Sequence, residues 1–417
     1  MSNLGQHLKF SNGKTSPDRT DTGFYPVYGA NGIIGYSSEY NSDENTIIIG
    51  RVGSYCGSVH FSDKKCWVTD NAISARSMNL KESIFWFYYL KSLNLNSMRV
   101  GSGQPLLNQT ILKSISLPDL NINKIKVGEI LLSFDQKIDL NTQINQTLEQ
   151  IAQALFKSWL VDFDPVRAKV QALSDGLSLE QAELAAMQAI SGKTPEELTA
   201  LSQTQPDRYA ELAETAKAFP CEMVEVDGVE VPKGWEVSTI GDCYDVIMGQ
   251  SPKGETYNEN KQGMLFYQGR AEFGWRFPTP RLFTTEPKRI AEENSILMSV
   301  RAPVGDINIA LEKCCIGRGL AALQHKSKSL SFGLYQIQSI KPKDLFNGEG
   351  TVFGSINQAN LKNIQIINPD EKFIQLFEKY LSSCDSKIMN NEIENNALKE
   401  IRDLLLPRLL SGKIEND

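Results

Sequence analysis

The sequence lacks the residue patterns on which most metal sites and disulfide frameworks depend. Its 417 residues include three histidines and seven cysteines, and no two cysteines form a Cys-x-x-Cys pair. The histidines His7, His60 and His325 are widely separated along the chain. We therefore expect no metal site, no zinc ribbon and no disulfide framework.

Long apolar runs are absent as well. The longest, residues 84–90, is far shorter than the roughly 20 residues that a transmembrane helix needs. The first seven residues, Met-Ser-Asn-Leu-Gly-Gln-His, have neither a basic start nor an apolar stretch, as a secretory signal would. We expect no membrane segment and a cytoplasmic location.

Catalytic signatures are also missing. Gly13-Lys14-Thr15 and Gly192-Lys193-Thr194 lack the upstream glycine of a phosphate-binding loop. The chain has no Gly-x-Ser-x-Gly elbow, no His-Glu-x-x-His zinc motif, and no Asn-Pro-Pro-Tyr or Asp-Pro-Pro-Tyr loop for adenine methylation. We therefore expect no active site and no cofactor bound by this chain.

Acidic charge is concentrated in one segment. The formal charge is −7, but residues 174–231 hold twelve acidic and three basic side chains. The remainder has 40 basic and 38 acidic side chains, and is therefore nearly neutral. The overall negative charge thus does not argue against binding of nucleic acid by the rest of the chain.

An internal repeat dominates the sequence. Residues 131–155 and 381–405 share ten identities in 25 positions without a gap, at an offset of 250. Upstream, the pattern Asn-Gln-x-x-Leu-Lys-x-Ile at residues 108–115 recurs at 357–364. Near the start, Ser16-Pro17 corresponds to Ser251-Pro252. Offsets of 250 and 249 over separate blocks, with a longer loop near the start of the second copy, indicate a tandem duplication and hence a pseudo-twofold molecule.

Each copy has a β-rich part followed by a helical part. Short β-branched runs between glycines and prolines, such as residues 46–49, predict the β-rich globular units. In the helical parts, apolar residues at spacings of three and four predict a coiled-coil seam. The seam residues that we predict are Ile144, Leu148, Ile151, Leu155, Leu398, Ile401 and Leu405.

Two matching helices can bury their seams on each other, and a pseudo-twofold pairing makes them antiparallel. A seam of about 30 residues would be about 45 Å long, and would act as a spacer between two globular heads. The alternative is that each helix packs on its own globular unit. The fold class that we predict is α+β, with two β-rich domains separated by an antiparallel coiled coil.

Arginines alternate with aromatic residues in a loop-like part of the second copy, residues 267–278. Arginine can pair bidentately with guanine or phosphate, and glutamine with adenine. Any one of these arginines is more often a structural ion pair, but the set in two repeats favours DNA. The candidate DNA-binding residues are Tyr28, Asn31, Arg51, Arg76, Gln268, Arg270, Arg276, Arg281, Arg301 and Arg318.

Three motifs together resemble the specificity subunit of type I restriction-modification systems: Phe156-Lys157-Ser158-Trp159-Leu160-Val161-Asp162-Phe163-Asp164-Pro165, the opening Pro232-Lys233-Gly234-Trp235 of the second repeat, and the closing Leu406-Pro407-Arg408-Leu409-Leu410-Ser411-Gly412-Lys413-Ile414. The resemblance covers nearly the whole chain. It implies two target-recognition domains and two conserved helical regions. It also implies double-stranded DNA, two modification subunits and, through them, restriction subunits as partners. S-adenosylmethionine, ATP and Mg would be bound by those partners.

On this basis we divide the chain into target-recognition domain 1 (1–124), a first helical region (125–169), an acidic helical linker (170–231), target-recognition domain 2 (232–370) and a second helical region (371–417). The first repeat departs from the family pattern because it lacks the Pro-x-Gly-Trp opening and has Gln6 where the second has Asp242. The linker is interpreted as solvated, with a docking surface as the alternative.

The predicted function is recognition of an asymmetric bipartite DNA site by a non-catalytic subunit that directs adenine methylation and DNA cleavage by its partners. The rival hypothesis is a duplicated protein-interaction scaffold whose loop arginines are structural.

Overall fold

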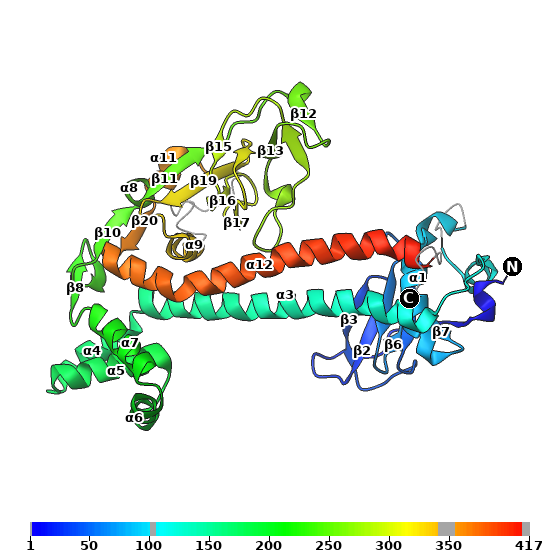
Figure 1. Ribbon diagram of the computed structural model, residues 1–417, viewed down its shortest axis with the longest axis horizontal. Helices are drawn as coiled ribbons and strands as arrows, with labels where there is room; N and C mark the ends of the chain where they lie inside the picture. The colour runs from blue at the N-terminus through cyan, green and yellow to red at the C-terminus, as the bar shows by residue number, and fades with distance from the viewer. Residues whose placement is uncertain (1, 101–105, 341–354, 411–417) are drawn as a thin grey trace. The chain divides into compact units, whose positions relative to one another are not determined.

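The computed structural model describes residues 2–100, 106–340 and 355–410 (Figure 1). The predicted motif residues Ser411, Gly412, Lys413 and Ile414 lie outside the described residues. The chain divides into two compact units, Met1–Ile144 with Asn390–Asp417, and Asn145–Met389. Two long helices, α3 (Lys124–Leu160) and α12 (Glu371–Leu410), each contribute one segment to each unit.

The β-rich part of the first unit, which we call the first head, consists of two small sheets and short helices. One sheet is antiparallel, in the order β1 (Leu8–Asn12), β7 (Ala72–Ser77), β4 (Thr46–Gly50) and β5 (Val59–Ser62). The other has the order β3 (Gly32–Ser37), β2 (Tyr25–Gly29) and β6 (Trp67–Val68). The helical elements are η1 (Leu4–Gln6), η2 (Leu80–Glu82), α1 (Ser83–Ser92), η3 (Leu95–Met98) and α2 (Gln109–Ser114).

The β-rich part of the second unit, the second head, repeats this plan. Its four-stranded sheet has the order β11 (Tyr244–Met248), β19 (Leu320–His325), β16 (Ile296–Ser299) and β17 (Ile307–Ile309). Its five-stranded sheet has the order β12 (Tyr257–Asn258), β14 (Leu282–Thr284), β13 (Met264–Tyr267), β18 (Cys314–Ile316) and β15 (Ile290–Ala291). Further elements are β10 (Glu236–Thr239), paired with β20 (Gln365–Asn368), α8 (Ile240–Cys243), η4 (Gly254–Thr256), η5 (Arg270–Glu272), α9 (Leu330–Gln338) and α11 (Gln358–Lys362).

The strand pairing confirms the internal repeat. The three-stranded sheet of the first head and the five-stranded sheet of the second contain the same parallel pair, β2 with β6 and β13 with β18. Parallel pairing across such short strands is rare in otherwise antiparallel heads. The connection into the helical part is also shared, because the amide of Leu4 donates to the carbonyl of Ile115 at 3.0 Å, and that of Ile240 to Ile364 at 3.0 Å. Both heads are copies of one α+β fold.

The long helices run antiparallel within each unit. In the first unit, Asn141 of α3 donates to Glu394 of α12 at 2.8 Å. Asp135, which lies earlier in α3, pairs with Arg402, which lies later in α12. In the second unit, the rings of Phe156 and Phe377 are 5.7 Å apart, while Trp159 packs on Phe373 nearer the start of α12. Partners later in α3 thus meet partners earlier in α12, which is the predicted antiparallel arrangement.

The predicted seam is wrong at two of its positions. Ile151 and Ile401 are 53% and 44% exposed, whereas Leu148, Leu155, Leu398 and Leu405 are half-buried, as is Ile144. The buried heptad positions lie one residue further on. They are Leu131, Ile138, Asn145, Ala152 and Trp159 in α3, and Leu381, Ile388, Asn395 and Leu409 in α12. The apolar spacing predicted the wrong register because an alanine and two asparagines occupy buried seam positions, while Ile151 and Ile401 lie just outside the seam.

The acidic segment forms a packed helical subdomain in place of the solvated linker that we predicted. It comprises α4 (Asp164–Ser174), α5 (Leu179–Ser191), α6 (Pro195–Thr204) and α7 (Pro206–Ala218), followed by the hairpin β8 (Met223–Val226) and β9 (Val229–Pro232). Its own core includes Met187, Leu198 and Leu212. Thr215 hydrogen-bonds with Tyr380 of α12 at 2.7 Å, and buried Lys169 donates to the carbonyl of Phe219 at 2.7 Å.

All seven cysteines are free. Within the described ranges, no group of three His, Cys, Asp or Glu side chains is placed to hold a metal ion. No helix in the described part of the chain is long and apolar enough to cross a membrane.

Candidate nucleic-acid interface

In the second head, backbone hydrogen bonds bring four loops together. The amide of Gly249 donates to Leu320 at 2.9 Å, that of Gly317 to Tyr267 at 2.8 Å, and that of Val300 to Gly319 at 2.9 Å. These bonds join the loops that follow β11, β13, β16 and β18. We call residues 249–251, 268–272, 301–305 and 317–319 the second loop edge.

Four of the predicted residues lie on this edge, and their side chains are exposed: Gln268, Arg270, Arg301 and Arg318. Arg270 pairs with Asp306, directly after the loop of Arg301. Arg301 and Arg318 make no side-chain hydrogen bond or ion pair within the described residues, and both are exposed there. Arg281 lies beside the edge, because it pairs at 3.1 Å with Glu272, which also accepts from the amide of Gly269 at 3.2 Å.

The first head has an equivalent surface, the first loop edge, formed by residues 13–14, 30–31, 51–57 and 69–71. The amide of Thr69 donates to Tyr28 at 3.0 Å, and that of Arg51 to Asn71 at 3.0 Å. Arg51 follows β4 directly, as Val300 follows β16, and the amide of Val300 makes the equivalent bond to Gly319. Asn31 is exposed on this edge, while Arg51 is half-buried. Two of the predicted residues, Asn31 and Arg51, are therefore brought together here.

Both loop edges depend on glycine at one equivalent position. A Cβ on Gly13 would lie 1.9 Å from the carbonyl oxygen of Thr69, and a Cβ on Gly249 would lie 2.1 Å from that of Gly317. Such distances are well inside van der Waals contact, so the backbones approach too closely for any side chain. The available sequence signal for this equivalence was the matching pair Ser16-Pro17 and Ser251-Pro252, which lie a few residues after Gly13 and Gly249.

Two predicted DNA-binding residues of the first head, Tyr28 and Arg76, do not lie on the first loop edge. Tyr28 is 7% exposed and packs with Ile48 and Val68, and burial raises the pKa of its phenol. Arg76 pairs with Asp43 at 2.6 Å, and opposes Thr46 at the start of β4, whereas the loop edge follows the end of that strand. Tyr28 is a core residue and Arg76 a surface ion pair. The predicted DNA contact of Tyr28 is corrected accordingly, whereas that of Arg76 stays a prediction away from the loop edge.

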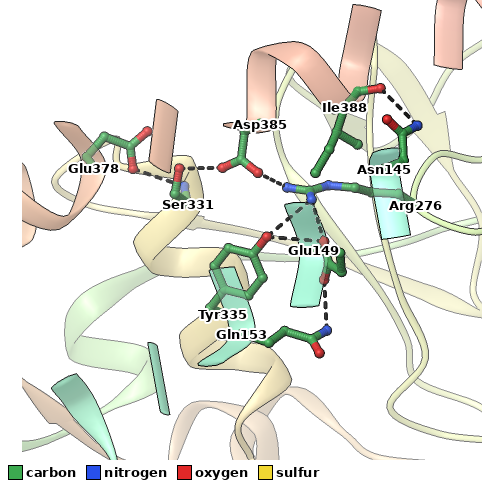
Figure 2. Close-up of polar contacts among 9 residues, drawn as sticks. All are labelled: Asn145, Glu149, Gln153, Arg276, Ser331, Tyr335, Glu378, Asp385 and Ile388. Carbon is green, nitrogen blue, oxygen red and sulfur yellow. Dashed lines mark hydrogen bonds and ion pairs between the residues drawn. The ribbon is translucent and has the colours of Figure 1, made fainter. Parts of the chain in front are cut away.

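Arg276 is the largest departure from the prediction. It is 6% exposed and forms a buried ion-pair cluster with both long helices (Figure 2). Its Nη1 lies 2.5 Å from the carboxylate of Glu149 in α3, and its Nη2 pairs with Asp385 in α12. The hydroxyl of Tyr335 in α9 donates to Glu149 at 3.1 Å and accepts from Arg276 at 3.2 Å. This guanidinium is not available to DNA.

Burial lowers the pKa of Arg276, but the nearby Asp385, Tyr335 and Glu149 outweigh it and hold the pKa above its ordinary value. The residue is therefore a permanent cation. Burying an ion pair is costly unless its geometry and hydrogen bonds are good, and here each carboxylate also accepts from a hydroxyl, because Ser331 donates to Asp385. Spacing along the sequence could not show this, because the acidic partners lie 127 and 109 residues away.

The arrangement suits reading of a DNA groove. Exposed guanidinium groups donate in a fork that matches guanine or phosphate, and exposed amides can pair with adenine. Small, closely approaching loops allow the backbone to reach a base edge. Each head presents such a surface once, at the same place in its fold.

Comparisons with known proteins agree with this interpretation. Residues 1–150 and 232–400 match the family described as the type I restriction modification DNA specificity domain. The chain is 48% identical over 326 residues to the type I restriction enzyme HindI specificity subunit of Haemophilus influenzae, covering 72% of this chain and 69% of that protein. It is 23% identical over 349 residues to the type I restriction enzyme MjaIX specificity subunit of Methanocaldococcus jannaschii, covering 80% and 69%.

A solved structure shares the fold. The crystal structure of the type I restriction-modification system S subunit from M. genitalium matches with a TM-score of 0.59 and 17% sequence identity, covering 98% of this chain and 94% of that one. At this identity the likeness concerns the fold alone.

A duplicated α+β fold with a loop edge on each copy defines a DNA-specificity protein. The chain belongs to the type I restriction modification DNA specificity family. Its role is DNA-sequence recognition without catalysis of its own, within a type I restriction-modification system. The family assignment supports this role and does not support the protein-interaction scaffold.

Proposed function

We propose that the chain directs a type I restriction-modification assembly to an asymmetric, bipartite DNA site, with one half read by each loop edge. The observation that carries this proposal is the equivalence of the two edges in backbone and their difference in side chains. Arg51 corresponds to Val300, because their amides donate to Asn71 and Gly319 respectively. Asp70 occupies the place of Arg318, since Thr69 and Gly317 make the same hydrogen bond to β2 and β13. Two loop edges with the same backbone but different hydrogen-bond donors and acceptors favour recognition of two different half-sites.

Affinity and specificity should have separate sources. Exposed arginines that contact phosphates give salt-dependent affinity, while base-edge contacts and DNA shape give sequence preference. The first edge, with Asp70 where the second has Arg318, would attract the backbone less strongly. The second half-site should therefore contribute more to the salt dependence of binding.

The partners that we propose are double-stranded DNA, two modification subunits and, through these, restriction subunits. The repeat supports two equivalent docking positions, because Ile151 and Ile401 occupy the same repeat position and are both exposed. In the first unit, Ile393 and Leu404 are also exposed and lie at helical spacing from Ile401. The exposed apolar face around Ile401 therefore continues along α12. In this assembly S-adenosylmethionine, ATP and Mg are bound by the partners, and the assembly acts in the cytoplasm.

The test is reconstitution with the modification subunit. Mapping of methylated adenines should give one asymmetric motif with an unspecified spacer, and footprinting should give two short protected blocks. One continuous block would contradict reading by two heads. Stable association without sequence-dependent methylation would instead favour a scaffold. Native mass spectrometry should find two modification subunits for each copy of this chain.

A further inference from the structure

We infer that Arg276 is a positioning residue that holds the second loop edge in place by anchoring it to the long helices. The inference rests on the proposed function, in which the second loop edge reads one half of the DNA site. It concerns a residue that itself contacts no DNA. All the contacts involved lie within the second unit.

The anchor is built from three elements around one guanidinium (Figure 2). Glu149 comes from α3, Asp385 from α12 and Tyr335 from α9. The carboxylates of Glu149 and Asp385 have side-chain exposures of only 12% and 10%. Glu378 of α12 fixes α9 further, because it accepts from the hydroxyl of Ser329 and, at 3.0 Å, from the amide of Ser331. The helices thus form a rigid base for the Arg276 side chain.

The backbone around Arg276 continues to the loop edge through β17. The amide of Ile309 donates to the carbonyl of Arg276 at 2.9 Å. Asn308 binds the backbone of Gly274, which lies two residues before Arg276. Its side chain accepts from the amide of Gly274 at 3.0 Å and donates to the carbonyl of Gly274 at 3.1 Å. Asp306, directly before β17, pairs with Arg270 on the loop edge and also accepts from the amide of Ser299 at 2.8 Å.

A second connection runs along the chain itself. The amide of Thr279 donates to the carbonyl of Glu272 at 2.8 Å, which closes residues 272–279, including Arg276, into a loop. Glu272 is buried; it accepts a hydrogen bond from the amide of Gly269 and forms an ion pair with Arg281. Movement of Arg276 would therefore shift both the Gln268–Glu272 part of the edge and the loop of Arg301.

An ion pair suits this positioning role because its geometry is specific. A guanidinium between two carboxylates fixes direction as well as distance, whereas apolar contacts allow sliding. Buried polar groups at one position are best attested as devices that select one arrangement among several. A displacement of about 1 Å at a recognition surface is enough to weaken a bidentate base contact, since hydrogen bonds weaken steeply with geometry.

The experiment uses the full chain assembled with its modification subunit, and methylation of two DNA libraries, each randomised in one half-site. Arg318→Ala, run in parallel, identifies the half-site read by the second edge. Arg276→Met should lower discrimination at that half-site about tenfold, and leave discrimination at the other half-site within about twofold. Arg276→Lys should recover part of the loss, because an ammonium group can still pair with one carboxylate.

Arg167→Met is the matched control, because Arg167 forms an exposed ion pair with Glu230 that is not connected to the loop edge. It should discriminate like the wild type. Since Arg276→Met leaves two buried carboxylates uncompensated, the triple variant R276M/E149Q/D385N removes those charges and protects the fold. It should still lose discrimination at the second half-site.

The outcomes separate the inference from the proposed function. Equal losses at both half-sites, or wild-type discrimination in the triple variant, would overturn the role of Arg276 while leaving DNA recognition intact. If the wild-type assembly shows no sequence preference in either half-site, the proposed function fails. Loss confined to the second half-site in both Arg276→Met and the triple variant supports the inference.

Discussion

Asp135 and Asp385 lie 250 residues apart at one repeat position, and each accepts a hydrogen bond from a hydroxyl on the helix of its own head. In the first unit the donor is Tyr88 of α1, at 2.6 Å; in the second it is Ser331 of α9. Each aspartate also pairs with an arginine, Arg402 in the first unit and Arg276 in the second. The duplication has thus kept the anchoring carboxylate, while the arginine comes from a long helix in one copy and a head loop in the other.

Removing the hydroxyl of Tyr88 should weaken the first unit. Burial is the largest cause that raises the pKa of Tyr88, and the hydrogen bond to Asp135 is the second. The phenol therefore keeps its proton and remains a donor. Tyr88→Phe should lower the free energy of unfolding by about 1–3 kcal/mol, because the hydrogen bond is to a charged group. Chemical denaturation of the isolated chain measures this change.

Tyr89→Phe is the control for that variant. Tyr89 lies on the same helix, and its hydroxyl has no hydrogen-bond partner among the described residues. A loss as large as that of Tyr88→Phe would show that the effect comes from the aromatic packing of α1 and not from Asp135.

The corrected seam is tested by two identical substitutions in the second unit. Ile388 is fully buried and Ile151 is 53% exposed. Ile388→Ala should cost about 2–5 kcal/mol of unfolding free energy, because it leaves a cavity. Ile151→Ala should cost less than about 1 kcal/mol, because an exposed side chain leaves no cavity. Denaturation midpoints compare the two, and a larger loss for Ile151→Ala would restore the register predicted from the sequence.

The repeat and the helices could be predicted because the identities between the two copies and the spacing of apolar residues are visible in the sequence itself. The register could not, because Asn145 and Ala152 occupy buried heptad positions that hydrophobicity alone assigns to solvent. A buried asparagine in a coiled coil specifies pairing at some cost in stability. Asn141 illustrates this, since it donates to both Glu394 and Asn395.

The candidate site was only partly predictable for a related reason. Composition and spacing identify arginines in loops, but not which of them have an acidic neighbour in space. Arg301 and Arg318 are exposed on the second loop edge, whereas Arg276 is taken up by two carboxylates far along the chain. The backbone hydrogen bonds that assemble the loop edges depend on tertiary structure, and no local pattern indicates them.

The exposed arginines of the second loop edge, Arg301 and Arg318, should determine binding at one half-site. Arg318→Ala and Arg301→Ala should each weaken specific DNA binding by about 1–3 kcal/mol if the side chain pairs with a base. A side chain that contacts only phosphate should weaken binding to all sequences alike and reduce the salt slope by about one. Titrations at several salt concentrations distinguish the two cases.

Arg76→Ala is the matched control for the loop edge, because Arg76 pairs with Asp43 away from the first loop edge. DNA affinity of this variant should stay within about twofold of the wild type, since the substitution removes only an exposed ion pair. An effect as large as that of Arg318→Ala would place the DNA-binding surface elsewhere on the heads.

His325 should make the second head sensitive to acid. Its ring lies between Tyr244 and Phe332, Lys326 is nearby, and its nitrogens contact Ser327 and Asn368. Burial lowers the pKa of this imidazole below its ordinary value. The unfolded chain, with a histidine pKa of about 6.5, therefore binds a proton that the folded chain does not. The stability that the neutral ring contributes is fully present above pH 6.5, and is lost as the pH falls from there towards the folded-state pKa.

Hydrogen exchange of the β19 amides at pH values between about 5 and 7.5, corrected for intrinsic exchange, should show this loss of protection. In His325→Gln the pH dependence of protection should become smaller, because glutamine does not titrate. His60 lies in the first unit, and burial lowers its pKa as well, so β4 and β5 provide the internal comparison, and their pH dependence should not change. Unchanged pH dependence of β19 in His325→Gln would mean that another group controls acid unfolding of the second head.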